Sequence, residues 1–194
     1  MASEHGLSTV ILASASSRRH ELLSHLISHF EIQTADIDES PYLNESPSAL
    51  VTRLAEMKAQ VISHKNPNSI VIGADTIVTL GLEIFGKPTS QNDSMAILKK
   101  LSGQRHTVMT GVAIISASKI ISKVVKTEVE FTCLSTMQIQ NYWQTGEPQD
   151  KAGSYAIQGI GGKFVKQITG SYSNVVGLPL VETQLMLAEM GIQE

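Results

Sequence analysis

Short apolar runs alternate along the chain with segments whose apolar positions recur at helical spacing. This alternation predicts an α/β fold, in which strands form a buried sheet and helices cover it. Strands are expected at 10–13, 30–37, 70–78, 107–115 and 123–134. Helices are expected at about 18–29, 47–64, 93–103, 135–146 and 179–190.

Individual residues indicate where two of these helices begin and where one loop lies. Ser46-Pro47 supplies a capping residue followed by proline at the first helical position. Ser135, with glutamine three residues later, forms a capping box. Six of the 14 glycines fall between Gly153 and Gly177, which predicts an irregular segment suited to close backbone approach to a ligand.

Size and composition fit one ordinary globular domain, 1–194. The chain is 42% hydrophobic and 17% charged, with a formal net charge of −3 and no lysine- or arginine-rich run, so neither nucleic acid nor an anionic membrane is expected as partner. The start has no basic segment, and the apolar run 10–13 is too short for a signal or a membrane span. A cytoplasmic protein is expected. The single cysteine, Cys133, excludes an intrachain disulfide and is expected to be buried.

The segment 12–19 runs from a predicted strand through a serine-rich turn into a helix that begins with Arg18 and Arg19. A helix N-terminus offers unpaired N–H groups and a positive dipole end, both of which suit phosphate. The dipole repels arginines in the first turn, and a bound anion would reverse that cost. Phosphate binding and simple solvation both remain open on residue chemistry alone.

Two charged residues fall at positions predicted to be apolar. Lys58 lies on the apolar stripe of the 47–64 helix, so its side chain either extends to the helix edge or points into a polar pocket. Asp75 is expected at or near the end of an otherwise apolar strand, where it either caps a turn or binds a ligand. Glu39 could bring a second carboxylate to the same edge, and such oxygen ligands suit Mg²⁺ or Mn²⁺.

Together these motifs resemble one family from Val10 to near Met190: the Maf family of nucleotide pyrophosphatases. The resemblance rests on an ordered series of segments at 12–23, 53–59, 73–78, 86–88, 101–103, 106–111, 150–159 and 176–180. It implies an inosine-triphosphatase-like fold, with a long mixed sheet flanked by helices, an active-site cleft between two lobes, and a homodimer. One departure is Ser17, where the family usually has proline before the arginine pair; its loss could loosen the turn but removes no contacting group.

The resemblance also implies a function and roles for individual residues. Asp75 matches the catalytic carboxylate, and Glu39 matches an acidic position near a divalent metal (Mg²⁺, Mn²⁺ or Co²⁺) that Asp75 would also bind. Gln158 is typical of the subgroup that hydrolyses dTTP and UTP to the monophosphate and pyrophosphate. The positions that match substrate contacts are Ser16, Arg18, Arg19, Lys58, Thr76, Lys87 and Gln158.

Two other classes of protein compete with this interpretation. A nucleotide-binding regulator of cell division would bind without turnover, but it would have no need of a carboxylate among phosphate ligands. A phosphatase or kinase is disfavoured because no Gly-x-x-x-x-Gly-Lys-Ser/Thr loop is present.

Overall fold

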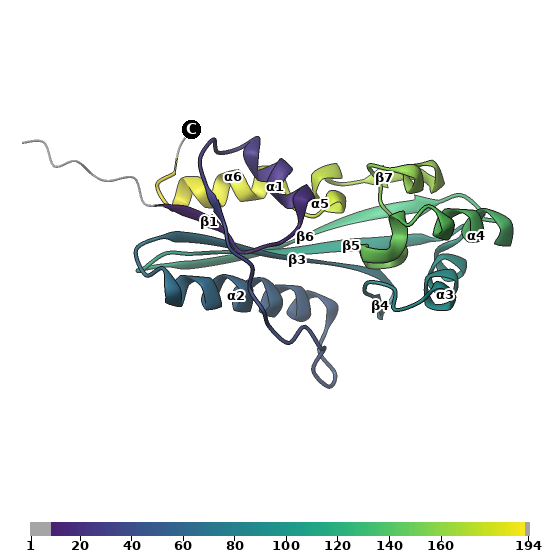
Figure 1. Ribbon diagram of the computed structural model, residues 1–194, viewed down its shortest axis with the longest axis horizontal. Helices are drawn as coiled ribbons and strands as arrows, with labels where there is room; N and C mark the ends of the chain where they lie inside the picture. Colours follow the sequence, from purple (N-terminus) through teal and green to yellow (C-terminus); the bar gives the residue numbers. More distant parts are fainter. Residues whose placement is uncertain (1–8, 193–194) are drawn as a thin grey trace, which may run out of the picture.

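The computed structural model describes residues 9–192 as a mixed seven-stranded sheet with helices on both faces (Figure 1). The strands are β1 (Val10–Leu12), β2 (Glu31–Ile32), β3 (Ile70–Leu80), β4 (Glu83–Phe85), β5 (Arg105–Ile115), β6 (Ile120–Phe131) and β7 (Val165–Thr169). The α-helices are α1 (Ser17–Ser24), α2 (Pro47–Lys65), α3 (Gln91–Leu101), α4 (Thr136–Gln144), α5 (Tyr172–Val176) and α6 (Leu180–Glu189). The predicted α/β class is confirmed.

The sheet has the order β2-β1-β3-β5-β6-β7, and β4 pairs with the far end of β3. β1 runs parallel to β2 and β3, whereas the other pairings are antiparallel. The long strands β3, β5 and β6 therefore form a continuous antiparallel platform (Figure 1).

One stretch of β3 has strand neighbours on a single side. β5 pairs with it from Val71 to Thr79, but on its other edge β1 reaches only Ile72 and β4 begins only at Val78. Among the strands of the described chain, none pairs with 73–77 on that edge. This opening gives a ligand room beside the middle of the sheet.

Two glycines let α2 lie close against the sheet. A Cβ at Gly73 would stand 2.2 Å from the carbonyl oxygen of Ala55, and a Cβ at Gly111 would stand 2.3 Å from that of Val51. Both distances are far below contact, so only glycine allows this approach. The close packing brings side chains on the inner face of α2 onto the middle of β3.

The buried side chains form one core at each end of the platform and two smaller clusters under α2. At one end β1, β3 and β5 pack against α1 and α6. At the other end β3, β5 and β6 pack against α3 and α4. We call these the α1 lobe and the α3 lobe, and the uncovered stretch of β3 lies between them (Figure 1).

Several local predictions are wrong. The strand expected at 30–37 is only Glu31–Ile32, because the edge strand β2 pairs with β1, which is itself only three residues long. Cys133 is exposed, since β6 ends at Phe131 and the chain leaves the sheet before the cysteine. The glycine-rich segment also contains regular elements, β7 and α5.

No helix in the part of the chain that the structure describes has the length and apolar character needed to cross a bilayer.

Candidate active site

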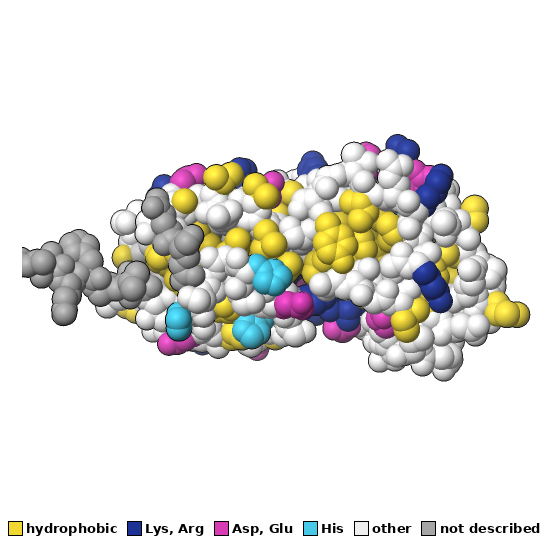
Figure 2. Space-filling view, turned by 90° about the horizontal axis from the view of Figure 1, so that it is seen from above, with side chains coloured by type: hydrophobic (Ala, Val, Ile, Leu, Met, Phe, Trp, Pro, Cys, Tyr) yellow, Lys and Arg dark blue, Asp and Glu magenta, His cyan; other side chains and the backbone are white. Residues whose placement is uncertain are grey.

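A cavity of about 620 Å³ opens beside the uncovered stretch of β3, with walls from both lobes. This volume is in the range of small-molecule sites. Figure 2 shows basic and acidic side chains side by side midway along this face of the molecule. All nine residues to which the sequence assigns site roles line the cavity: Ser16, Arg18, Arg19, Glu39, Lys58, Asp75, Thr76, Lys87 and Gln158. Their placement in one cavity is observed, and their individual roles stay predictions.

The centre of the site is an ammonium group shared by two carboxylates. Lys58 Nζ lies 2.7 Å from Asp75 Oδ1 and 2.7 Å from Glu39 Oε1. Lys58 and Asp75 are each only 8% exposed, so each charge needs the other to offset its desolvation. Of the two interpretations of Lys58, the polar pocket is therefore the observed one.

Asp75 lies in the middle of β3 and not at its end, which corrects the sequence prediction. β3 continues to Leu80 because its antiparallel ladder with β5 is unbroken, with Asp75 opposite Gly111. The alternation of side chains along β3 places the carboxylate on the α2 face, where it contacts Lys58, and it lines the cavity beside the stretch that neither β1 nor β4 covers. The alternative role, a cap on a neighbouring turn, does not fit this position.

Glu39 reaches the cavity from the loop before α2. Burial by itself would raise the pKa of Glu39, but the hydrogen bond and charge of Lys58 outweigh it and leave that pKa below its usual value. The loop is held by Arg53, whose guanidinium contacts both oxygens of Glu45 at 2.7 and 2.8 Å and donates to the carbonyl of Ser40 at 3.0 Å. Arg53 was not among the predicted site residues.

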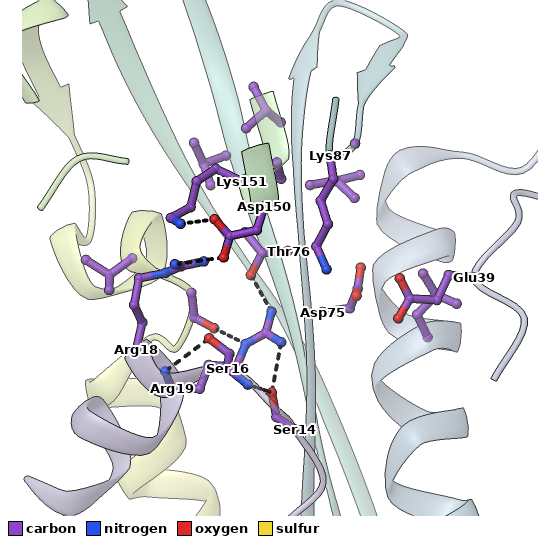
Figure 3. Close-up of a pocket in the computed structure, with 18 of the residues that line it drawn as sticks. Ser14, Ser16, Arg18, Arg19, Glu39, Asp75, Thr76, Lys87, Asp150 and Lys151 are labelled. Carbon is purple, nitrogen blue, oxygen red and sulfur yellow. Dashed lines mark hydrogen bonds and ion pairs between the residues drawn. The ribbon is translucent and has the colours of Figure 1, made fainter. Parts of the chain in front are cut away.

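The donor set fits a divalent cation of the Mg²⁺ type. Mg²⁺ is usually held by one or two carboxylates together with substrate phosphates and water, and Asp75 and Glu39 face the same cavity (Figure 3). Within residues 9–192 no cluster of three or more His, Cys, Asp or Glu side chains could enclose a metal by itself. A metal here would therefore depend on the substrate for its remaining ligands.

Arg19 joins three parts of the cavity wall. Its Nε donates to the carbonyl of Gly177 at 2.8 Å, Nη2 to the hydroxyl of Thr76 at 2.9 Å, and Nη1 to that of Ser14 at 3.4 Å (Figure 3). Burial lowers the pKa of Arg19 and the charge of nearby Asp75 opposes this shift. Because several N–H groups are engaged by the protein, Arg19 is better placed to fix the wall than to move with a ligand.

The turn before α1 is a regular helix start, with Ser17 at the position where the sequence resemblance implies proline. Ser16 caps the helix, its hydroxyl accepting the N–H of Arg19 at 3.4 Å, and Ser17 occupies the first helical position. Proline favours that position because its fixed φ suits a helix start. Ser17 is exposed and contributes no contact that proline would lack.

The mouth of the cavity carries two residues that the sequence did not single out. Asp150 pairs with Arg18 at 3.9 Å and with Lys151, so it links the α1 lobe to the α3 lobe (Figure 3). Lys151 also lines the cavity and adds a fifth basic side chain to it. The adjacent Asp150 and Lys151 lie in the segment 150–159 that the sequence marked. Exposed pairs of opposite charge are common on protein surfaces, however, so the pair alone did not indicate a site. Lys87 follows the β4 turn and points toward Asp75 (Figure 3).

The far wall is the segment from Lys151 to Gln158. Tyr155 is buried and its hydroxyl lies 2.9 Å from His106 Nε2. Gly153 N donates to the carbonyl of Gly86 at 3.1 Å, next to Lys87. Gln158 is exposed at the rim.

Comparison with known proteins adds to this geometry. The chain is 51% identical over 187 residues to a dTTP/UTP pyrophosphatase of Pseudoalteromonas atlantica, covering 94% of this chain and 97% of the relative. It is 50% identical over 194 residues to a protein of the same name from Shewanella denitrificans, covering 96% and 98%. A solved HAM1 protein from Coxiella burnetii has the same fold at 16% identity, with a TM-score of 0.53 over 94% of this chain and 100% of that one. The family described as Maf-like protein matches residues 9–190, and the chain belongs to the Maf family.

Proposed function

We propose that this protein hydrolyses UTP and dTTP to the nucleoside monophosphate and pyrophosphate. The observation that carries the proposal is the buried Asp75–Lys58 pair, set in a cavity with four further basic side chains. Relatives with about half of their residues identical are named dTTP/UTP pyrophosphatase. A buried carboxylate among phosphate-binding cations is the arrangement expected for water attack on a phosphoryl group.

The basic residues neutralise the triphosphate, and this is their main contribution to catalysis. Lys58 and Lys87 flank Asp75, and Arg18 stands at the mouth of the same cavity. Placed around the leaving pyrophosphate, they stabilise the charge that develops as the bond to it breaks. Arg18 has only a 3.9 Å contact with an exposed carboxylate, so it is free to turn to a phosphate.

Asp75 accepts or orients the proton of the attacking water. The water attacks the α-phosphorus in line with the departing pyrophosphate, which leaves the monophosphate with the new P–O bond. The ion pair with Lys58 holds the carboxylate at the cavity wall. The protein thus presents the base before any substrate enters.

Asp75 and Glu39 are the residues that would hold a divalent metal, Mg²⁺, Mn²⁺ or Co²⁺. When bound, such an ion neutralises phosphate charge and polarises the phosphoryl group. Lys58 contacts both carboxylates and so keeps them on one side of the cavity.

Gln158 at the rim is proposed to read the edge of uracil or thymine. Its amide offers a donor and an acceptor, which suits the alternating groups of these bases. A site built for such hydrogen bonds rejects bases that leave its polar groups unpaired.

Product analysis tests the activity directly. Purified protein is incubated with each nucleoside triphosphate and Mg²⁺, Mn²⁺ or Co²⁺, and the products are separated. Release of pyrophosphate from UTP and dTTP is expected. Orthophosphate alone would indicate a phosphatase, and binding without turnover would favour the regulator of cell division. A preference for GTP would contradict the assignment to the UTP and dTTP subgroup.

The variant Asp75→Asn tests the catalytic carboxylate. Pyrophosphate release should fall by at least about 10³-fold, because general bases and their positioning contribute factors of this order. Asp36→Asn, on an exposed residue outside the cavity, is the matched control. Near-normal turnover by a folded Asp75→Asn protein would remove Asp75 from its proposed role.

We also propose an assembly state and a location. A homodimer is consistent with the exposed apolar side chains of Tyr172, Val181 and Leu185 on α5 and α6, and light scattering coupled to size exclusion would measure it. A cytoplasmic location is proposed together with these substrates.

A further inference from the structure

Tyr142 and Glu147 lie behind the cavity and bind the backbone of the segment that carries Gln158 by hydrogen bonds. Tyr142 on α4 donates its hydroxyl to Glu147 Oε1 at 2.6 Å and accepts the N–H of Ala156 at 3.0 Å. The carboxylate of Glu147 then accepts the N–H of Ile160 at 2.8 Å and that of Gly161 at 2.9 Å. The two side chains therefore hold the backbone on both sides of Gln158.

Two glycines in the segment allow its backbone to approach Tyr142 and Glu147 closely enough for these hydrogen bonds. A Cβ at Gly159 would stand 2.2 Å from Glu147 Oε2, and a Cβ at Gly161 would stand 2.5 Å from Tyr142 Oη. Any other residue at either position would push the segment off the pair. Part of the glycine-rich stretch thus serves an internal carboxylate and not a ligand, which corrects the expectation from sequence for these two positions.

The pair is strong and stands apart from the reacting groups. Tyr142 is 1% exposed, and three donors converge on one carboxylate, which makes the hydrogen bonds charge-assisted. Burial would raise the pKa of Glu147, but the Tyr142 hydroxyl and the two backbone N–H groups leave it below its usual value. Neither residue is among those that line the cavity. Their hydrogen bonds reach the cavity only through the segment they hold, but the charge of Glu147 also acts on Lys151 in the cavity wall. Tyr142→Phe leaves that charge in place and therefore isolates the effect of the segment.

We propose that Glu147 and Tyr142 are positioning residues for base selection: they fix Ala156–Gly161 so that the Gln158 amide meets the pyrimidine edge. This inference rests on the proposed function, in which Gln158 reads the base. Without the pair the segment can shift, and a donor and acceptor aimed at uracil lose their alignment. The triphosphate contacts proposed for Arg18, Lys58 and Lys87, which lie outside this segment, should be unaffected.

The test separates base selection from phosphate binding. For each variant, kcat/KM is measured with UTP and with CTP, which presents a different hydrogen-bonding edge, and the inhibition constant of inorganic tripolyphosphate is measured in parallel. Glu147→Gln keeps the size of the side chain but turns one acceptor into a donor that faces N–H groups. Tyr142→Phe removes only the hydroxyl and serves where Glu147→Gln folds poorly. Glu130→Gln, at a partly buried, ion-paired carboxylate on β6 outside the cavity, is the matched control.

Glu147→Gln and Tyr142→Phe should each lower the UTP/CTP selectivity ratio roughly tenfold, the size expected when one well-placed hydrogen bond is lost. The inhibition constant for tripolyphosphate should stay within about twofold of wild type. Glu130→Gln should change neither quantity. Combining Glu147→Gln with Gln158→Ala should lower the ratio no further than Gln158→Ala alone, because both changes act through one amide.

The possible failures are distinguishable. A ratio that falls in Gln158→Ala but not in Glu147→Gln or Tyr142→Phe overturns the positioning role and leaves the proposed function standing. Equal losses for UTP, CTP and tripolyphosphate would also overturn it, since they would indicate general disruption. Wild-type protein that releases no pyrophosphate from any nucleoside triphosphate would overturn both proposals.

Discussion

Acid should destabilise this protein through one buried histidine behind the cavity. His106 on β5 is 2% exposed, lies with its ring 4.7 Å from that of Phe131, and has Nε2 2.9 Å from the hydroxyl of Tyr155. Its Nδ1 has no hydrogen-bond partner among the described residues. With no acidic partner to favour the imidazolium, burial lowers the pKa of His106 to about 4.

The sign and size of the effect follow from linkage. The pKa of His106 is about 4 in the folded protein and about 6.5 in the unfolded chain, so between these values the unfolded chain binds the extra proton. Stability is therefore full above about pH 6.5 and falls as the pH drops toward 4. The difference of about 2.5 between the two pKa values lowers the free energy of unfolding by at most about 3 kcal/mol. About 2 kcal/mol of this should be lost between pH 7 and pH 5.

Urea unfolding at pH 7 and pH 5, followed by far-UV circular dichroism, measures this loss. The comparison protein is His106→Gln, which keeps a polar side chain near Tyr155 but cannot titrate. Carboxylates contribute to the pH dependence of both proteins and cancel in the difference. The free energy of unfolding of wild type should fall by about 2 kcal/mol more than that of the variant. An equal fall in both would refute a neutral, buried His106.

Three further predictions concern packing and charge. Gly111→Ala would drive a methyl group into the carbonyl of Val51 and should lower unfolding free energy by at least about 2 kcal/mol, measured by urea titration. Arg18→Ala should lower kcat/KM for UTP at least about tenfold, whereas Arg105→Ala on the exposed surface should leave it unchanged. Lys58→Met should abolish turnover and cost about 3 kcal/mol of stability, because it leaves a buried carboxylate unpaired; a stable, active variant would contradict this.

Elements with strong local signals could be predicted from the sequence. The helix from Pro47 begins where its cap and proline place it, and the capping box at Ser135 has both of its hydrogen bonds. Short edge elements could not be predicted, because β2 exists only where β1 supplies a partner. Local pattern carries no information about the length of a neighbouring strand.

The candidate site likewise contains residues that the sequence could identify and residues that it could not. Lys58 could be singled out because it interrupts an apolar stripe, but only the close approach of α2 to Gly73 and Gly111 directs it to Asp75. Lys151 was missed because an exposed Asp-Lys pair has no feature that separates a cavity mouth from ordinary surface. Residues whose neighbours come from distant segments need the fold to be recognised.

The charge of the cavity bears on what it holds. Among the described residues five basic side chains line it (Arg18, Arg19, Lys58, Lys87 and Lys151) against three acidic ones (Glu39, Asp75 and Asp150), an excess of two positive charges. A nucleoside triphosphate carries about four negative charges near neutral pH, since its terminal phosphate titrates near pH 6. A divalent cation brings the ligand to about two negative charges, the value that the cavity balances. A monophosphate with the same cation would be close to neutral and would gain little from these side chains. The charge balance therefore favours the proposed metal-bound triphosphate over the nucleoside monophosphate, whereas pyrophosphate keeps most of the charge of the triphosphate and is not distinguished in this way.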